Sequence, residues 1–160
     1  MQDLLPRAER IAALLKATNA TVAVAESSAG GLISAALLSV PGASAYFLGG
    51  AVVYTRKARS LLTDITDADM LGLRSSSEPY ATLLASRAQA RFGAVWGLSE
   101  TGATGPAGNS YGDAAGHGCF AVAGPRAAVR TLETGSTDRV ANMRVFAATA
   151  LDLLEAALHG

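Results

Sequence analysis

The chain of 160 residues is long enough to bury one hydrophobic core, and half of its residues are hydrophobic. Thirteen basic and thirteen acidic residues cancel, which excludes the strongly basic surface that marks many nucleic-acid-binding proteins. Cys119 is the only cysteine, so an intramolecular disulfide is excluded, and no apolar run is long enough to span a membrane. We therefore expect one domain over residues 1–160, located in the cytoplasm, with neither membrane nor nucleic acid as a partner.

Helical and strand-like patterns alternate along the chain. Apolar periodicity predicts helices over residues 4–16, 30–38, 56–62, 79–92 and 138–158. Short apolar runs predict strands over residues 21–25, 51–55, 95–99, 119–123 and 127–134. Gly124-Pro125 is a turn signal between the last two strands, which predicts an antiparallel hairpin. The pattern predicts a mixed sheet with helices on both faces.

The segment AESSAGG, residues 25–31, predicts a sharp turn from a strand into a helix. Free N–H groups at a helix N-terminus, with glycines that allow close approach, can bind phosphate or stabilise an oxyanion. Alternatively, Ser27 or Ser28 only caps the helix. A nucleophilic serine needs a base, for which Lys57 and His117 are the candidates. Asp113 shares a loop with His117, so a Ser–His–Asp arrangement is a further alternative.

Three predicted strand ends lead into loops with chemically useful residues. These loops cover residues 26–31, 54–59 and 101–109. Ligands of open α/β sheets bind beyond the carboxyl ends of strands, so we expect the three loops to share one site. The small residues of the third loop suit the wrapping of a phosphate or ribose, or form a flexible connection. Arg139 and Arg144 on the last helix are candidates to bind an anion.

Together these segments resemble the CinA C-terminal domain family over nearly the whole chain. AESSAGG is similar to the family's AESCTGG, VPGASAYFLGG to VPGSSAYFLGG, and TGATGPAG to TGIAGPGG. The resemblance implies an α/β fold, a three-layer α/β/α sandwich with a mixed, mostly parallel sheet. It implies an amidohydrolase that converts nicotinamide mononucleotide and water into nicotinic acid mononucleotide and ammonia, as in NAD salvage. No metal or organic cofactor is implied, and the abundant alanine and leucine suit a homodimer.

The resemblance also assigns roles to individual residues. The family's catalytic serine falls on Ser27, and its site tyrosine on Tyr54. Its helix arginine falls on Arg144, with Arg139 close by. The backbone around the corner is expected to form the oxyanion hole, and the third loop to hold the nucleotide; the substrate-binding residues are then Ser28, Gly30, Gly31, Thr101, Gly102 and Gly105.

One departure from the family pattern concerns the base. The family's YSNEAK reads YTRKAR here, so that Arg59 stands where the base lysine belongs. Arginine stays protonated and is a poor base. Lys57 would share a face with position 59 on an extended segment but not on a helix. The alternatives are a hydrolase that uses Lys57 or His117 while Arg59 binds the substrate phosphate, and a nucleotide-binding or regulatory homologue without turnover.

Overall fold

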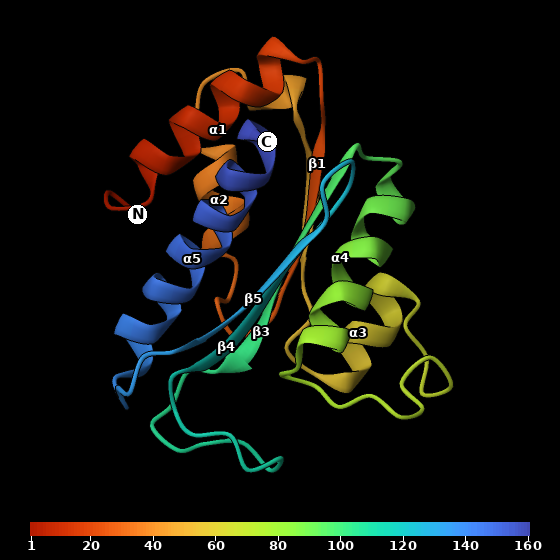
Figure 1. Cartoon of the computed structure of the whole chain (residues 1–160), viewed down its shortest axis with the longest axis vertical. Coiled ribbons are helices and arrows are strands. Elements are labelled where there is room, and N and C mark those ends of the chain that lie inside the picture. The colour runs from red at the N-terminus through yellow and green to blue at the C-terminus, as the bar shows by residue number, and fades with distance from the viewer.

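The computed structural model describes all 160 residues (Figure 1). In chain order the elements are α1 (Leu5–Ala17), β1 (Val22–Glu26), α2 (Leu32–Leu38), η1 (Ala43–Ala45), β2 (Phe47–Val52), α3 (Arg56–Thr63), α4 (Glu78–Phe92), β3 (Trp96–Ala103), β4 (His117–Ala123), β5 (Ala128–Glu133) and α5 (Arg139–His159). No helix among them is both long and apolar enough to cross a lipid bilayer.

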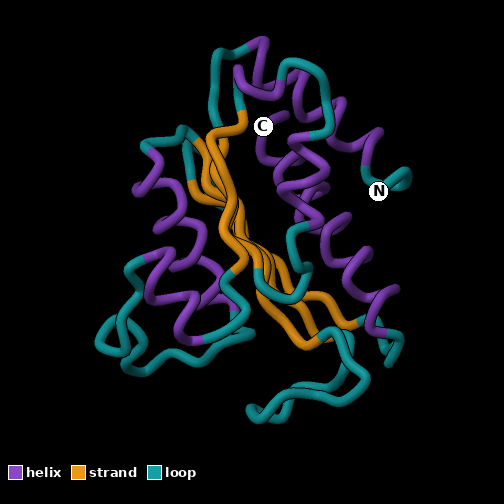
Figure 2. Tube along the Cα trace, turned by 180° about the vertical axis from the view of Figure 1, so that it is seen from behind, coloured by secondary structure: helices purple, strands orange, loops and turns teal.

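The five strands form one mixed sheet in the order β2-β1-β3-β4-β5. β1 runs parallel to β2 and β3, whereas β4 runs antiparallel to β3 and β5. Helices α1, α2 and α5 cover one face, and α3 and α4 cover the other (Figures 1 and 2). The chain therefore forms the predicted α/β/α sandwich with a mixed sheet, in which parallel and antiparallel pairings are equal in number.

Apolar side chains fill both spaces between the sheet and the helices. β1 is buried along its whole length because it lies in the interior of the sheet and is covered on both faces. On the α5 side, the rings of Phe120 and Phe146 pack edge to face with their centroids 5.7 Å apart. On the α4 side, β3 approaches so closely that a Cβ added to Gly97 would lie 2.0 Å from the carbonyl oxygen of Ala85.

Two strand boundaries differ from the sequence prediction, and both differences affect the site. β2 begins at Phe47, not residue 51, and ends at Val52, so Tyr54 lies in the connection to α3 and not in a strand. β3 continues to Ala103 because its last residues pair with β4 (Figure 1). Thr101 is therefore fixed in the sheet, and the loop that was expected from residue 101 begins only at Thr104.

Candidate active site

Three adjoining cavities follow the carboxyl ends of β1, β2 and β3. The serine cavity, of about 310 Å³, contains Ser27, Tyr54, Arg59 and Thr101 in its wall. The arginine cavity, of about 260 Å³, shares Arg56, Arg59 and Tyr111 with it and also lies against Arg74. The loop cavity, of about 220 Å³, lies between Ser28, Tyr54, Arg139 and the start of the β3–β4 loop. The three loops predicted to share a site therefore do come together.

Two buried glutamates hold the corner that carries Ser27. Glu26, the last residue of β1, accepts hydrogen bonds from the backbone N–H groups of Gly31, Ile33 and Ser34 at the start of α2. Glu100 of β3 accepts from the N–H groups of Ser27 at 2.9 Å and Ala29 at 2.8 Å, and from the Ser28 hydroxyl. The corner is thus rigid, while the half-buried Ser27 hydroxyl makes no hydrogen bond within the protein.

These carboxylates change the expected oxyanion hole. The N–H groups of Ala29 and Gly31 bind glutamates, and that of Gly30 donates to the Ser27 carbonyl. Only the Ser28 N–H has no acceptor, so Gly30 and Gly31 do not supply donors as expected. Complete burial raises the pKa of Glu100 to about 7, although its three hydrogen bonds lower it and the nearby Glu26 raises it further.

Arg139, not Arg144, reaches the site from α5. Its Nη1 donates to the Gly105 carbonyl at 2.6 Å, and its Nη2 lies 3.2 Å from the Tyr54 hydroxyl. The guanidinium also stacks over the Tyr54 ring, 5.9 Å from its centroid. Arg144 lies on another face of the helix, where it pairs with Asp3. The expectation that Arg144 binds in the site is therefore wrong, and Arg139 takes this place. The two arginines are five positions apart and so lie on different faces of the helix.

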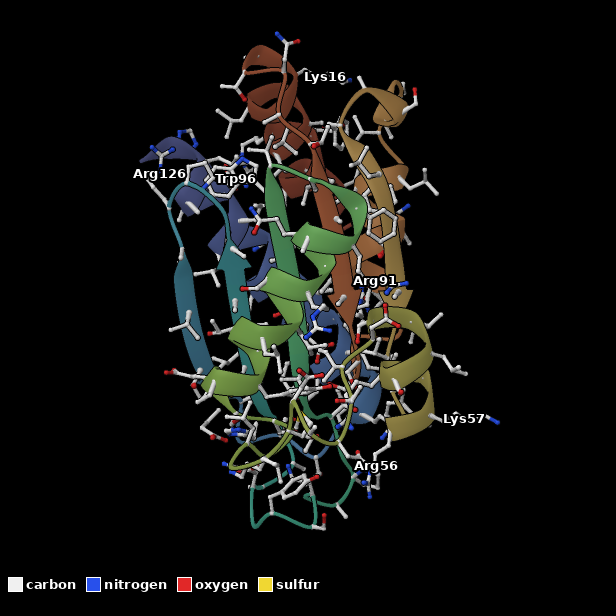
Figure 3. The ribbon with its side chains drawn as sticks, turned by 90° about the vertical axis from the view of Figure 1, so that its right-hand side faces the viewer. Lys16, Arg56, Lys57, Arg91, Trp96 and Arg126 are labelled. Atoms are coloured by element: carbon white, nitrogen blue, oxygen red, sulfur yellow. The ribbon has the colours of Figure 1, made fainter.

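The segment Arg56–Thr63 is helical, which separates Lys57 from Arg59. Thr55 caps the helix by accepting from the Ala58 N–H at 3.1 Å. Residues two apart on a helix project in nearly opposite directions. Arg59 is consequently buried in the wall of the cavities, whereas Lys57 is exposed and points away from the molecule (Figure 3). Lys57 contributes to none of the three cavities, contrary to the expectation that it could act as the base.

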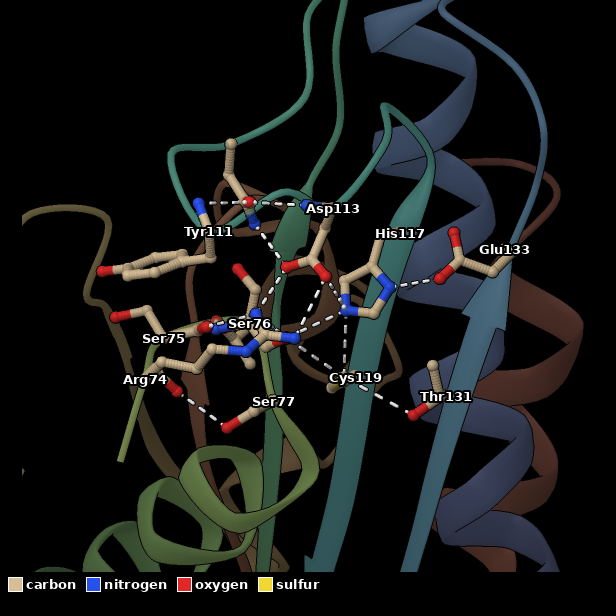
Figure 4. Close-up of polar contacts among 12 residues, drawn as sticks. Arg74, Ser75, Ser76, Ser77, Tyr111, Asp113, His117, Cys119, Thr131 and Glu133 are labelled. Atoms are coloured by element: carbon tan, nitrogen blue, oxygen red, sulfur yellow. Dashed lines mark hydrogen bonds and ion pairs between the residues drawn. The ribbon is translucent and has the colours of Figure 1, made fainter. Parts of the chain in front are cut away.

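Both ring nitrogens of His117 are bonded to other parts of the chain (Figure 4). Its Nδ1 contacts Glu133, and its Nε2 donates to the Ser76 carbonyl at 2.9 Å. Since both partners are acceptors, the imidazolium form suits this place. Burial lowers the pKa of His117, but the bonds to Glu133 and Ser76 outweigh it, so the pKa is raised. Asp113 lies 3.8 Å from Nε2.

This arrangement contradicts the Ser–His–Asp alternative and the role of His117 as a replacement base. The nitrogen that would have to face a serine is bonded to the Ser76 carbonyl, and His117 contributes to none of the cavities. Ser76 has a left-handed backbone, with φ of +56°, and its N–H donates to the Thr101 hydroxyl at 3.3 Å. His117 and Thr101 thus hold Ser76, which forms part of the serine cavity.

Several site residues carried no recognisable motif in the sequence. Glu100 directly precedes the third loop in the sequence, and its place beside the corner follows only from the pairing of β3 with β1, which sets it opposite Glu26. Ser75, Ser76 and Tyr111 come from the α3–α4 and β3–β4 connections. Arg74 is brought to the cavities by two bonds from its guanidinium to Asp113, at 2.6 and 3.0 Å. For Ser75 and Ser76, the run of three serines before α4 was the only feature of the sequence that could have indicated a site.

The chain is similar to members of one family in both sequence and structure. The model of the CinA C-terminal domain family matches residues 5–158. A CinA-like protein from Gloeobacter violaceus is 37% identical over 145 residues, which cover 89% of this chain and 34% of that protein. One from Anaeromyxobacter sp. (strain K) is 39% identical over 161 residues, covering 99% and 38%. The chain therefore spans about a third of the length of these curated relatives.

Solved structures have the same architecture. The competence/damage inducible protein CihA from Agrobacterium tumefaciens superposes with a TM-score of 0.88 at 28% identity, over 99% of this chain and 96% of that one. A competence-damaged protein (CinA) superfamily protein from Klebsiella pneumoniae gives a TM-score of 0.90 at 22% identity, over 98% of both chains. The second likeness, at lower identity, concerns the fold alone.

Proposed function

The chain belongs to the CinA C-terminal domain family, and from this premise we propose that it is an amidohydrolase that acts on the carboxamide of nicotinamide mononucleotide. One water is consumed for each ammonia released, and the other product is nicotinic acid mononucleotide. The observation that carries the proposal is the Ser27 hydroxyl, which is free of internal hydrogen bonds and faces a cavity of about 310 Å³. A cavity of this size, with a few converging polar groups, suits a small molecule.

In this proposal Ser27 is the nucleophile. Its oxygen attacks the carboxamide carbon, and the C–N bond of the resulting tetrahedral adduct breaks. Ammonia leaves, and the acyl ester that remains on Ser27 is then hydrolysed by water. The unpaired N–H of Ser28 is the candidate donor to the oxyanion, because the residue after a nucleophilic serine often has this role. The fixed corner supports this step, since a rigid nucleophile loses little freedom on reacting.

The proton of Ser27 needs an acceptor in the same cavity. Tyr54 is our candidate: its oxygen already accepts from Arg139, so its own proton is directed elsewhere, toward the leaving nitrogen. Tyr80 also faces the cavity, but burial raises its pKa to about 12 and keeps it neutral. Tyr54 then takes the proton from Ser27 as it gives its own to the departing amine.

A second candidate function is nucleotide binding without turnover. The specific observation in its favour is that Arg59 contributes to the serine cavity, where no lysine, histidine or carboxylate is present. Arginine stays protonated and does not accept the serine proton. In this alternative Ser27, Tyr54 and Thr101 only contact the nucleotide.

Ammonia release from nicotinamide mononucleotide separates the two functions. The purified chain is expected to release ammonia, and Ser27→Ala to reduce the rate by about a thousandfold or more. Ser60→Ala is the matched control, because Ser60 is exposed on α3 and contributes to none of the cavities. No release by the wild type, together with calorimetric binding of the mononucleotide, would replace the hydrolase by the binding function.

A further inference from the structure

We propose that the arginine cavity is a subsite for a phosphate monoester, formed by Arg56, Arg59 and Arg74. The identity of the nucleotide rests on the proposed function, but binding at this subsite does not require turnover. The three guanidinium groups come from two segments, the start of α3 and the connection before α4, and all three face one cavity. Asp67 is the one carboxylate in its wall, and the remaining side chains, Met70, Leu73, Ser75 and Tyr111, carry no full charge.

The carboxylates around the cavity leave an excess of positive charge. Asp67 pairs with both Arg56 at 3.1 Å and Arg59 at 2.9 Å. Asp113 pairs with Arg74 at 2.6 Å and lies outside the cavity wall. Three guanidinium groups therefore face two carboxylates, one of which is shared. A cavity with one uncompensated positive charge and several free N–H donors favours an anion.

The buried side chain of Arg59 is a further reason to expect an anion in the arginine cavity. Its side chain is only 5% exposed, and its Nε is buried without any hydrogen-bond partner. A buried donor without an acceptor costs about 1–3 kcal/mol, and more when the group is charged. Because Arg59 contributes to both the serine and the arginine cavities, it stands at the boundary between them. An anionic oxygen bound there would accept this N–H.

The other two arginines suit the same ligand in different ways. Arg74 donates to Asp113 with both Nη atoms and stacks over the Tyr111 ring, 5.8 Å from its centroid, so the position of its charge is fixed before binding. Arg56 is 79% exposed and is held only by the exposed Asp67, so it can turn toward a bound group. Guanidinium forks match the paired oxygens of phosphate, and a phosphate monoester offers three oxygens to the arginines where a carboxylate offers two.

The position of the subsite also fits the substrate of the serine cavity. The two cavities share Arg56, Arg59, Ser75 and Tyr111, so a ligand can extend from one into the other. A phosphate in the arginine cavity would leave the remainder of a mononucleotide in the serine cavity, with Ser27 in its wall. Arg139 lies in the wall of the loop cavity instead. The proposal thus assigns the phosphate to the α3 arginines and not to α5.

Calorimetric titration with four probes tests the subsite: nicotinamide mononucleotide, nicotinamide riboside, nicotinic acid riboside and inorganic phosphate. Nicotinamide mononucleotide is expected to bind the wild type at least about tenfold more tightly than nicotinamide riboside, which lacks the phosphate, and inorganic phosphate is expected to compete with it. Arg59→Gln should remove this difference. Arg56→Gln should reduce it, and since Arg56 is exposed this variant is safe for folding. Arg130→Gln, an exposed arginine of β5 outside the cavities, is the matched control.

The outcomes distinguish this proposal from the proposed hydrolase. Equal binding of mononucleotide and riboside, or a phosphate preference that persists in both Arg59→Gln and Arg56→Gln, overturns the subsite whether or not ammonia is released. Loss of the preference in Arg139→Gln alone would assign the phosphate to the loop cavity. A preference for nicotinic acid riboside over nicotinamide riboside that depends on Arg59 would show that the arginine binds a carboxylate. Phosphate-dependent binding without ammonia release keeps the subsite and removes the hydrolase.

Discussion

Nη2 of Arg59 lies 2.9 Å from Oδ1 of Asp67, and the two side chains differ greatly in exposure, at 5% and 74%. The guanidinium is therefore fixed inside the cavity wall, while its counterion stands in solvent. The neighbouring arginines hold the pKa of Asp67 below its usual value, chiefly through the hydrogen bond from Arg56. Asp67 is thus a charged but weakly held partner that a bound anion would displace.

Asp67→Asn is expected to strengthen phosphate binding. Removal of the carboxylate charge leaves Arg56 and Arg59 without their shared counterion, so a phosphate no longer competes with it. Because the pair is exposed on the aspartate side, the gain in affinity is modest, up to about fivefold for nicotinamide mononucleotide. Calorimetry at low and at high salt checks it, with Asp69→Asn as a control near the cavity. Weaker binding by Asp67→Asn would mean that Asp67 orients the arginines instead of competing for them.

Arg59→Lys is expected to increase the rate of ammonia release. Position 59 faces the same cavity as Ser27, and the buried site lowers the pKa of a lysine and thereby makes it a better base. The same change reduces phosphate affinity, because the ammonium lacks the fork of donors. Steady-state rates measured over a range of substrate concentrations separate the two effects. A lysine variant no faster than the wild type, at saturating substrate, would contradict the assignment of position 59 to the place of the base.

Lys57→Ala is expected to leave both activity and binding unchanged. Lys57 is exposed, points away from the molecule and contributes to none of the cavities. Ammonia release measured beside the wild type checks this expectation. A loss of more than about tenfold, equivalent to about 1.4 kcal/mol of transition-state stabilisation, would require a rearrangement of α3.

Glu100→Gln is expected to flatten the dependence of stability on pH. The folded pKa of about 7 lies above the ordinary value of 4.5, so the folded state binds the proton more tightly than the unfolded state. Glu100 therefore destabilises the folded state least below pH 4.5, where it is protonated in both states. The free energy of unfolding falls as the pH rises from there through about 7, by about 3 kcal/mol at most. Chemical denaturation at pH 5 and pH 8 measures the loss. If Glu100→Gln loses as much stability between pH 5 and pH 8 as the wild type, Glu100 is not the group that causes this pH dependence.

His117→Gln is expected to lose stability and to weaken nucleotide binding together. The pKa of His117 is raised from 6.5, so its contribution is fully present below pH 6.5 and disappears as the pH rises through the folded value. The variant should therefore be destabilised more at pH 6 than at pH 9, by about 1–3 kcal/mol at the lower pH. Because His117 acts through Ser76, the Michaelis constant should rise more than the turnover number falls.

The sequence by itself determined the elements and the general place of the site. The strand Val22–Glu26, the corner at Ser27 and the helices followed from apolar periodicity and turn residues, which act locally. Because ligands of α/β sheets bind at the carboxyl ends of strands, the shared location of Ser27, Tyr54 and Thr101 was also predictable. The family resemblance rested on the same segments.

Only the tertiary structure decided which charged residues belong to the site. Lys57 and Arg59 are two positions apart, and the choice between them depended on whether the segment was helical and on what α3 packs against. In the same way, the position of each arginine around α5 decided that Arg139 reaches the site and that Arg144 does not. Glu100 became a buried acceptor because β3 pairs with β1, which places its carboxylate beside the N–H groups of the corner. Burial and long-range hydrogen bonds arise between distant segments, so no local pattern specifies them.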